Sequence, residues 1–283
     1  MVIVDKCYLD GCSATRIERE LARCTVLITY ELVYEITTNT LCKNPRDYFD
    51  KIANLNLVRT RPLLDLARKE ITVQKRVDNI VDDDETTKFI DFVRNGKGEP
   101  LTWDVQKQVE DFFEVEQPRR LLDGLARMWD AKFDDLFEKC KAERNKFFET
   151  REASEIEFVA GQYKELMGLV GHGMTIAQEH KMTREPEAGW LIHDWERLRN
   201  LLAFRYRLNG NRPEQLKANK KLANQLLDLH YLAFLSHADA IATGDTALVI
   251  PLAKAYGPTG LKIIPIRAGN STSTQDGHGD ESV

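Results

Sequence analysis

Residues 228–245, DLHYLAFLSHADAIATGD, decide how the fold of this chain is interpreted. The apolar spacing predicts a helix over residues 214–237, and residues 240–243 predict a short buried strand. A helix over residues 246–256 and a strand over residues 261–266 are predicted to follow. Strands that alternate with helices are typical of an α/β domain with a mostly parallel sheet.

The N-terminal part of the chain repeats this alternation. Residues 2–4 are β-branched and are followed by an acid, and residues 25–29, TVLIT, are a second candidate strand. Residues 14–23 and 31–41 have the apolar spacing of helices, and residues 48–75 are also predicted to be helical. We therefore expect one sheet that combines strands from both ends of the chain.

A long segment with helical spacing separates these two parts. Over residues 101–208, aromatic and apolar side chains recur at intervals typical of packed helices. We therefore expect a discontinuous α/β domain formed by residues 1–75 and 212–267, with a large all-helical insertion over residues 76–211. Residues 268–283 are small and polar, and they are expected to be disordered.

The overall composition limits the class of protein. The formal net charge of −5 disfavours tight non-specific binding to nucleic acid, although a bound metal can supply positive charge locally. No stretch reaches the roughly 18 apolar residues that a membrane span needs, so no membrane association is expected. The cysteines form no CxxC pair and have no zinc-like spacing, which favours reduced thiols and a cytoplasmic protein.

Four acids are expected to meet at the carboxyl edge of the sheet. Asp5 ends the first strand, and Asp245 follows the strand over residues 240–243. Glu35 lies about two helical turns after the second strand, and Asp228 lies in the helix that leads into the strand before Asp245. Because clustered carboxylates repel one another, a divalent cation would stabilise them, and hard oxygen ligands suit Mg²⁺ or Mn²⁺. Such an ion can activate water and stabilise charge as a phosphodiester breaks.

Three short motifs resemble those of PIN-domain nucleases. VIVDKCYL resembles their first strand and its acid, and VLITYELVYEI resembles their second motif, with Glu35 as the matching acid. DLHYLAFLSHADAIATGD resembles their closing motif, which matches Asp228, Thr243 and Asp245. The resemblance covers roughly residues 1–45 and 215–266.

This resemblance implies a PIN-like three-layer domain in which Asp5, Glu35, Asp228 and Asp245 bind Mg²⁺ or Mn²⁺ and act in catalysis. Family members mostly cleave RNA, and many are toxins or RNA-processing enzymes. The resemblance therefore implies an endonuclease, a hydrolase that acts on RNA in preference to DNA, in a toxin-like, defence or RNA-maturation role. It also suggests a protein inhibitor or a homodimer as assemblies.

Other residues are expected to support the four acids. Thr243 and Asp239 are assigned supporting positions around them, and neither is a main ligand. For Asp239 the preferred interpretation is local, as a cap at the start of the strand over residues 240–243 or as a partner in a nearby pair. A basic stretch precedes Asp228 and is a candidate for contacts with a nucleic-acid backbone; the alternative is a solvated helix face. Its candidate residues are Arg205, Arg207, Lys217, Lys220 and Lys221.

Several polar residues have competing interpretations. Asp10 and Glu31 are alternative ligands that lie close in sequence to the preferred acids. His230 and His237 are expected to make structural hydrogen bonds. The acidic run over residues 78–85 is expected to be a solvated loop or the start of a helix, because adjacent acids cannot all turn toward one ion.

Two other functions compete with the nuclease. A haloacid-dehalogenase-like phosphatase needs acids where Tyr8 and Val249 stand, so it is disfavoured. The second alternative is a PIN-like partner-binding or regulatory module with weak or no nuclease activity, in which the helical insertion recognises the partner.

Overall fold

The structure is a computed structural model that describes residues 1–38, 44–150, 154–170, 172–216 and 220–266. The predicted disordered tail over residues 268–283 lies outside the described residues. Within the described residues, no helix is both long and apolar enough to cross a membrane. Among the described residues, Cys7, Cys12, Cys24 and Cys140 form no disulfide.

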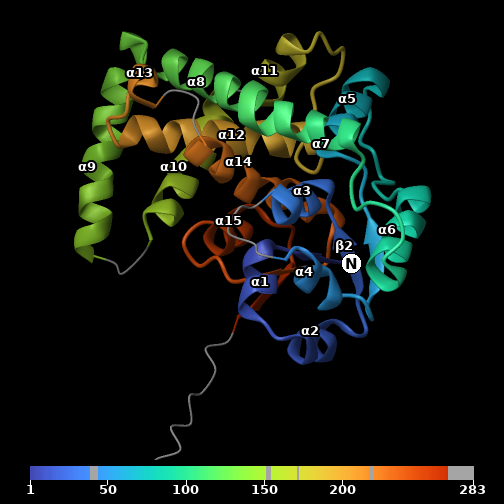
Figure 1. Ribbon diagram of the computed structural model, residues 1–283. Coiled ribbons are helices and arrows are strands. Elements are labelled where there is room, and N and C mark those ends of the chain that lie inside the picture. Colours follow the sequence, from blue (N-terminus) through green and yellow to red (C-terminus); the bar gives the residue numbers. More distant parts are fainter. Residues whose placement is uncertain (39–43, 151–153, 171, 217–219, 267–283) are drawn as a thin grey trace, which may run out of the picture.

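A five-stranded, wholly parallel sheet lies at the centre of the α/β part (Figure 1). Its order is β3-β2-β1-β4-β5, so the first strand of the chain is the central one and pairs with β4 from the C-terminal part. This arrangement confirms the expected α/β class and the union of the two ends of the chain. The strands are β1 (Val2–Val4), β2 (Thr25–Ile28), β3 (Asn56–Arg59), β4 (Ala240–Thr243) and β5 (Lys262–Pro265).

Strand β3 is the main departure from the predicted elements, because residues 48–75 were expected to be helical. Asn56–Arg59 instead pairs in parallel with β2. The strand is short, and it ends in an arginine that is only 1% exposed. The Arg59 guanidinium lies 4.0 Å from the ring centre of Tyr30 and donates a 2.7 Å hydrogen bond to the Pro100 carbonyl. These tertiary contacts stabilise a buried charge that the local sequence pattern does not indicate.

Helices flank the sheet and connect its strands (Figure 1). Helix α1 was not predicted, and it begins directly after Asp5. Asp82 accepts a 3.1 Å hydrogen bond from the Glu85 amide at the start of α6, which confirms that the acidic run begins a helix. The helices are α1 (Lys6–Gly11), α2 (Ala14–Leu21), α3 (Tyr30–Thr38), α4 (Arg46–Asp50), α5 (Leu63–Val73), α6 (Asp83–Asn95) and α15 (Val249–Tyr256).

The remaining helices form the upper part of the molecule in Figure 1. A π-helical turn, η1, joins α7 to α8, and α12 packs against α5, α8, α10 and α14. These elements are α7 (Trp103–Glu110), η1 (Asp111–Glu116), α8 (Gln117–Met128), η2 (Ala131–Phe133), α9 (Asp134–Thr150), α10 (Glu155–Val170), α11 (His172–Glu179), α12 (Leu191–Leu208), α13 (Pro213–Leu216), α14 (Lys220–Ala233) and η3 (Leu235–His237).

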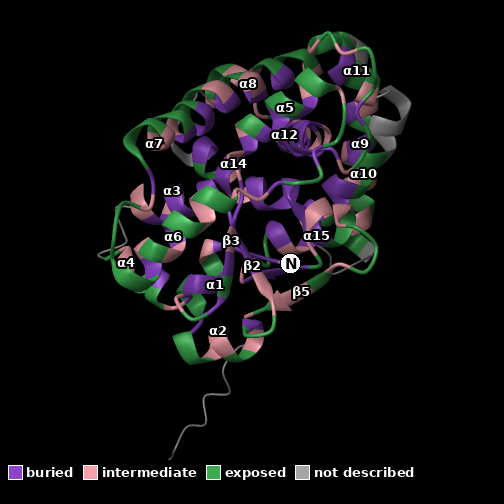
Figure 2. Cartoon of the chain, turned by 90° about the vertical axis from the view of Figure 1, so that its right-hand side faces the viewer, coloured by how far each residue is buried: buried purple, intermediate pink, exposed green. Residues whose placement is uncertain are grey.

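One hydrophobic core runs from the sheet into the helical part (Figure 2). Ile3 of β1, Trp195 of α12 and Phe113 of η1 belong to the same buried cluster. Helix α6 falls inside the segment expected to be an insertion, yet it packs on β3. The expected boundary at residue 75 therefore does not separate two packing units.

Candidate metal centre

Asp5 lies where the central strand ends and α1 begins. Its carboxyl is 1% exposed, and Oδ1 accepts a 2.7 Å hydrogen bond from the Tyr8 amide, so the residue caps the helix. Oδ2 accepts a hydrogen bond from the Thr243 hydroxyl at the end of β4. The acid is therefore held at the carboxyl edge by its own helix and by the neighbouring strand.

Thr243 connects Asp5 to Asp245. Its buried Oγ1 accepts a 3.0 Å hydrogen bond from the Asp245 amide while its hydroxyl donates to Asp5. Oδ1 of Asp245 accepts hydrogen bonds from the amides of Ala247 at 2.8 Å and Leu248 at 2.9 Å, which leaves Oδ2 outside these bonds. The structure thus places Thr243 in the supporting position that the sequence suggested.

The other two acids approach from helices. Glu35 lies on α3, and Oε2 accepts a 2.9 Å hydrogen bond from the Tyr231 hydroxyl. Tyr231 is buried on α14, one turn after Asp228, so both residues lie on the same side of that helix. Helices α3 and α14 pack against each other. The contact between them holds Glu35 next to the helix that carries Asp228.

Electrostatic effects connect Asp5 and Asp228 to the other two acids. We call Asp5, Glu35, Asp228 and Asp245 the acid cluster. Burial raises the pKa of Asp5 to about 7, and the charges of Glu35 and Asp245 add to that increase. Burial also raises the pKa of Asp228 to about 7, with further increases from Glu35, Asp245 and Asp5. The pKa of Glu35 is raised mainly by burial. The charges of Glu35 and Asp245 therefore make ionisation of Asp5 and Asp228 less favourable.

The chemistry of the acid cluster fits a hard divalent cation. All its donor atoms are carboxylate oxygens, and a cation would offset both the burial cost and the mutual repulsion. Among the described residues, no three His, Cys, Asp or Glu side chains are already close enough to hold an ion. Asp5 and Asp245 direct carboxylate oxygens at their own helix or turn amides. Side-chain rotation would be needed to bring the oxygens onto one ion.

Asp239 pairs locally at the start of β4, as its preferred interpretation predicted, and the assignment of a supporting position around the acid cluster is not met. It precedes β4, where its amide donates a 2.9 Å hydrogen bond to the Met1 carbonyl and its carboxylate pairs with the Met1 amino group. A strand advances about 3.3 Å per residue, so roughly 13 Å of extended chain separate Asp239 from Thr243. Proximity in sequence placed it at the wrong end of the strand.

Two members of the predicted basic stretch have structural partners instead of open charges. Arg205 donates to Glu155 Oε2 through Nη2 at 2.9 Å and through Nε at 3.1 Å. The Arg207 side chain is 3% exposed and pairs with Asp134 at 2.8 Å. The interpretation as a backbone contact is therefore wrong for Arg207, because its buried side chain is paired with Asp134 of α9. The Arg205 side chain is 29% exposed beside Glu155 of α10, so the interpretation of Arg205 stays a prediction. Lys217 lies outside the described residues, as do the side chains of Lys220 and Lys221.

His230 has the structural role that was expected. It is fully buried, its Nε2 lies 2.8 Å from the Thr29 hydroxyl, and its Nδ1 contacts the Leu227 carbonyl. Thr29 also accepts a 3.1 Å hydrogen bond from the Leu32 amide at the start of α3. Burial lowers the pKa of His230 to about 3, so the imidazole is neutral. It connects α14 to the first turn of α3.

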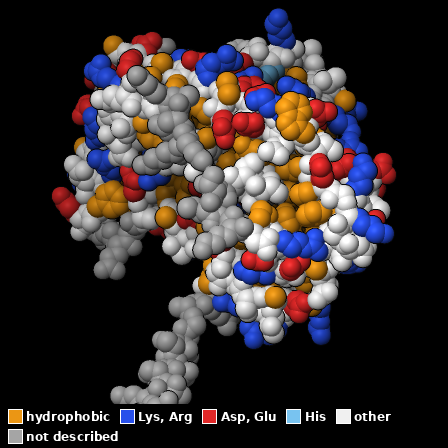
Figure 3. All heavy atoms as spheres, in the orientation of Figure 1, with side chains coloured by type: hydrophobic (Ala, Val, Ile, Leu, Met, Phe, Trp, Pro, Cys, Tyr) orange, Lys and Arg blue, Asp and Glu red, His pale blue; other side chains and the backbone are white. Residues whose placement is uncertain are grey.

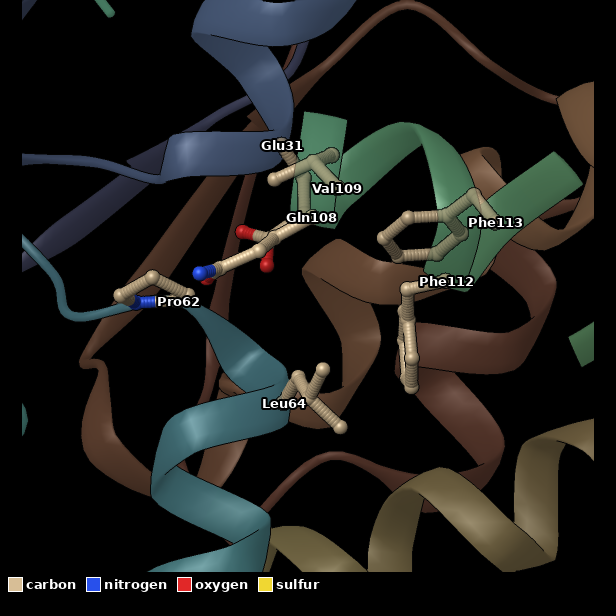
Figure 4. Close-up of a pocket in the computed structure, with 7 residues that line it drawn as sticks. All are labelled: Glu31, Pro62, Leu64, Gln108, Val109, Phe112 and Phe113. Atoms are coloured by element: carbon tan, nitrogen blue, oxygen red, sulfur yellow. The ribbon is translucent and has the colours of Figure 1, made fainter. Parts of the chain in front are cut away.

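Glu31 lies one turn before Glu35 but faces a small apolar pocket (Figure 4). Oε1 accepts a 2.8 Å hydrogen bond from the Leu63 amide, and Oε2 has no hydrogen-bond partner among the described residues. Burial raises the pKa of Glu31 to about 7. Glu31 is therefore not a ligand of the acid cluster, and it holds the start of α5. The apolar lining comes from Pro62, Leu64, Val109, Phe112 and Phe113.

Sequence analysis did not single out Lys6 and Tyr231 as site residues. Lys6 directly follows Asp5, and its ammonium acts on the charges of Glu35 and Asp228. Tyr231 donates to Glu35 from a position three residues after Asp228. Lys6 is next to Asp5 in the sequence, and Tyr231 lies one helical turn after Asp228. The contact of Tyr231 with Glu35 depends on the packing of α3 against α14, which the sequence does not reveal.

Two glycines next to the acid cluster seat the side chain of Ile266. Gly11 ends α1, and Gly244 lies between Thr243 and Asp245. A Cβ at either glycine would overlap Ile266 Cδ1. The turn that carries Asp245 is therefore packed directly against the residue that follows β5.

Comparisons of this chain with protein-family models, with curated proteins and with solved structures found no match.

Proposed function

We propose that this protein is a metal-dependent nuclease with a PIN-like fold, and that it hydrolyses phosphodiester bonds of RNA in preference to DNA. The proposal rests on the acid cluster. Asp5 and Asp245 follow neighbouring parallel strands and are linked through Thr243, while Glu35 and Asp228 come from helices α3 and α14, which pack together. The charges of Glu35 and Asp245 raise the cost of ionising Asp5 and Asp228. A fold keeps such repulsion when a cation is bound there in function.

In this proposal, Asp5, Glu35, Asp228 and Asp245 hold Mg²⁺ or Mn²⁺. A bound ion of this kind supplies an activated water and stabilises charge on the phosphate. Thr243 positions Asp5 and the Asp245 backbone through its two hydrogen bonds. Tyr231 positions Glu35 from the interior, where its hydroxyl is shielded from water.

The test is cleavage of single-stranded RNA and single-stranded DNA in Mn²⁺, with wild type, Asp228→Asn and Asp245→Asn. We expect wild type to cleave RNA faster than DNA, and both variants to lose on the order of 100-fold or more in kcat/KM. Asp239→Asn is the matched control, since Asp239 lies at the opposite end of β4. It should cleave like wild type.

Two results would contradict the proposal. The first is wild-type cleavage that survives both substitutions, which would place the activity elsewhere or in a contaminant. The second is no cleavage by wild type with Mn²⁺ or Mg²⁺, which would favour a partner-binding module.

A further inference from the structure

The first residue of α1, Lys6, lies beside the acid cluster. Its side chain is 15% exposed, and Nζ donates a 2.9 Å hydrogen bond to Asp10 Oδ2. Asp10 Oδ1 in turn accepts a hydrogen bond from the Tyr48 hydroxyl, and Lys6 Nζ lies 5.9 Å from the centre of the Tyr48 ring. The carboxylate of Asp10 and the ring of Tyr48 therefore hold the Lys6 ammonium in place at the start of α1.

The position of Lys6 also brings its charge to the acid cluster. Lys6 directly follows Asp5, and its helix α1 packs against α3, which carries Glu35, and against β4, which precedes Asp245. Asp10 is exposed, so the Lys6–Asp10 pair is accessible to a ligand from solvent. A pair of this kind is weak in water, and an anion can replace the carboxylate as the partner of the ammonium.

The net charge of the acid cluster with a bound cation explains why a nearby lysine would help substrate to bind. Four ionised carboxylates and one divalent cation leave a net negative centre, which repels a phosphodiester. The chain as a whole carries a net charge of −5, and on the face shown in Figure 3 basic and acidic side chains are interspersed. Arg207 is 3% exposed and paired with Asp134, so it is not accessible to a phosphate. A positively charged side chain next to the acid cluster would reduce the repulsion of an approaching phosphate.

We propose that the Lys6 ammonium binds a non-bridging oxygen of the substrate phosphodiester and positions it over the acid cluster. The phosphate oxygen replaces Asp10 Oδ2 as hydrogen-bond acceptor, and no covalent bond changes in this step. Asp10 and Tyr48 hold the side chain in place before substrate arrives. This inference rests on the proposed nuclease function and adds a substrate-positioning residue to it.

The test compares Lys6→Met and Lys6→Arg with wild type. We expect Lys6→Met to raise KM for single-stranded RNA by about tenfold with a smaller change in kcat, and Lys6→Arg to restore most of the loss. Loss of one phosphate contact should also reduce the slope of log KM against log salt by about 0.7. Lys51→Met is the matched control, because Lys51 lies 5.7 Å from the same Tyr48 ring and donates to the Leu9 carbonyl. It should leave KM unchanged.

Mn²⁺ affinity separates positioning from a structural effect. Removing a cation from the acid cluster should strengthen Mn²⁺ binding, whereas general damage to the site would weaken it. Fluorescence anisotropy of a labelled RNA oligonucleotide in Ca²⁺ measures substrate binding without cleavage, and Lys6→Met should weaken it about tenfold.

Different outcomes contradict the two proposals separately. If wild type cleaves RNA and Lys6→Met keeps the wild-type KM and salt slope, the role of Lys6 is wrong and the nuclease remains. If Lys6→Met loses Mn²⁺ affinity together with substrate affinity, Lys6 is structural. If wild type binds neither Mn²⁺ nor RNA, both proposals are wrong.

Discussion

Two successive turns of helix α3 carry glutamates with opposite surroundings. Glu31 faces apolar side chains and bonds to the Leu63 amide, whereas Glu35 accepts from Tyr231 beside the acid cluster. Burial raises the pKa of both carboxyls. A raised pKa therefore does not by itself identify a functional acid; the charges around it distinguish a structural group from a candidate ligand.

The largest expected difference between the two turns is in catalysis. Glu35→Gln should reduce kcat/KM for RNA cleavage on the order of 1,000-fold, because the amide keeps the bond from Tyr231 but cannot supply a ligand charge. Glu31→Gln should cleave like wild type, since Gln can still accept from the Leu63 amide. Equal losses in both variants, at unchanged melting temperature, would contradict the division of α3 into a structural and a functional turn.

Substitution by alanine should have the larger effect on stability at Glu31, whereas substitution by glutamine should have the larger effect on catalysis at Glu35. Glu31→Ala leaves the Leu63 amide without its partner and enlarges an apolar cavity, so it should lower the free energy of unfolding by about 3 kcal/mol. Glu35→Ala loses one hydrogen bond but relieves repulsion, so it should cost about 1 kcal/mol or less. Urea denaturation of metal-free protein measures both values. A larger cost at Glu35 would show that the second turn is the structural one.

Bound metal should stabilise the region around Glu35, and this stabilisation should not depend on Glu31. Mn²⁺ at 100 times its Kd is expected to raise the free energy of unfolding by about 2.7 kcal/mol, and chelation should reverse the effect. Glu31→Gln should keep this response, whereas Asp5→Asn should lose most of it. A melting-temperature shift that persists in Asp5→Asn would place the ion elsewhere.

The smallest expected effect is the pH dependence of the Asp5 contribution. Burial raises its pKa from the ordinary 3.8 to about 7 in the folded protein, so the folded state binds the proton more tightly. The contribution of Asp5 to stability is therefore highest at low pH and is lost as pH rises through 7.

Without metal, Asp5→Asn should therefore be more stable than wild type by a margin that grows by about 2 kcal/mol between about pH 5 and about pH 8. Chemical denaturation of both proteins at each pH measures this margin, and effects of the buried histidines cancel in the difference. A margin that stays constant or shrinks with rising pH would contradict the burial of an ionised Asp5.

Sequence patterns predicted the strands that carry the acid cluster well. β1 and β4 occupy the predicted residues, and β2 and β5 differ from prediction by a residue or so at their ends. β1 and β4 are short, buried apolar runs with an acid within two residues of their ends, so local pattern and burial agree. The acids are far apart in sequence, yet parallel topology brings them to one edge.

The features that local patterns missed depend on partners distant in the chain. β3 contains a buried arginine whose stabilising contacts come from Tyr30 and Pro100. The sequence predicts that Arg207 contacts nucleic acid, but in the structure its side chain is buried and paired with Asp134. No local periodicity indicates such pairings, because each depends on how helices pack after folding.

The packing of Ile266 against Gly11 and Gly244 has a consequence for sequence variation. These three positions share one volume, so a side chain at either glycine requires a smaller residue at 266. Gly244→Ala should weaken Mn²⁺ binding by displacing the turn before Asp245, and Ile266→Ala should compensate it in the double variant. Two residues without any ligand atom, one of the glycines and residue 266, would then have to change together for the proposed ion to bind as in wild type.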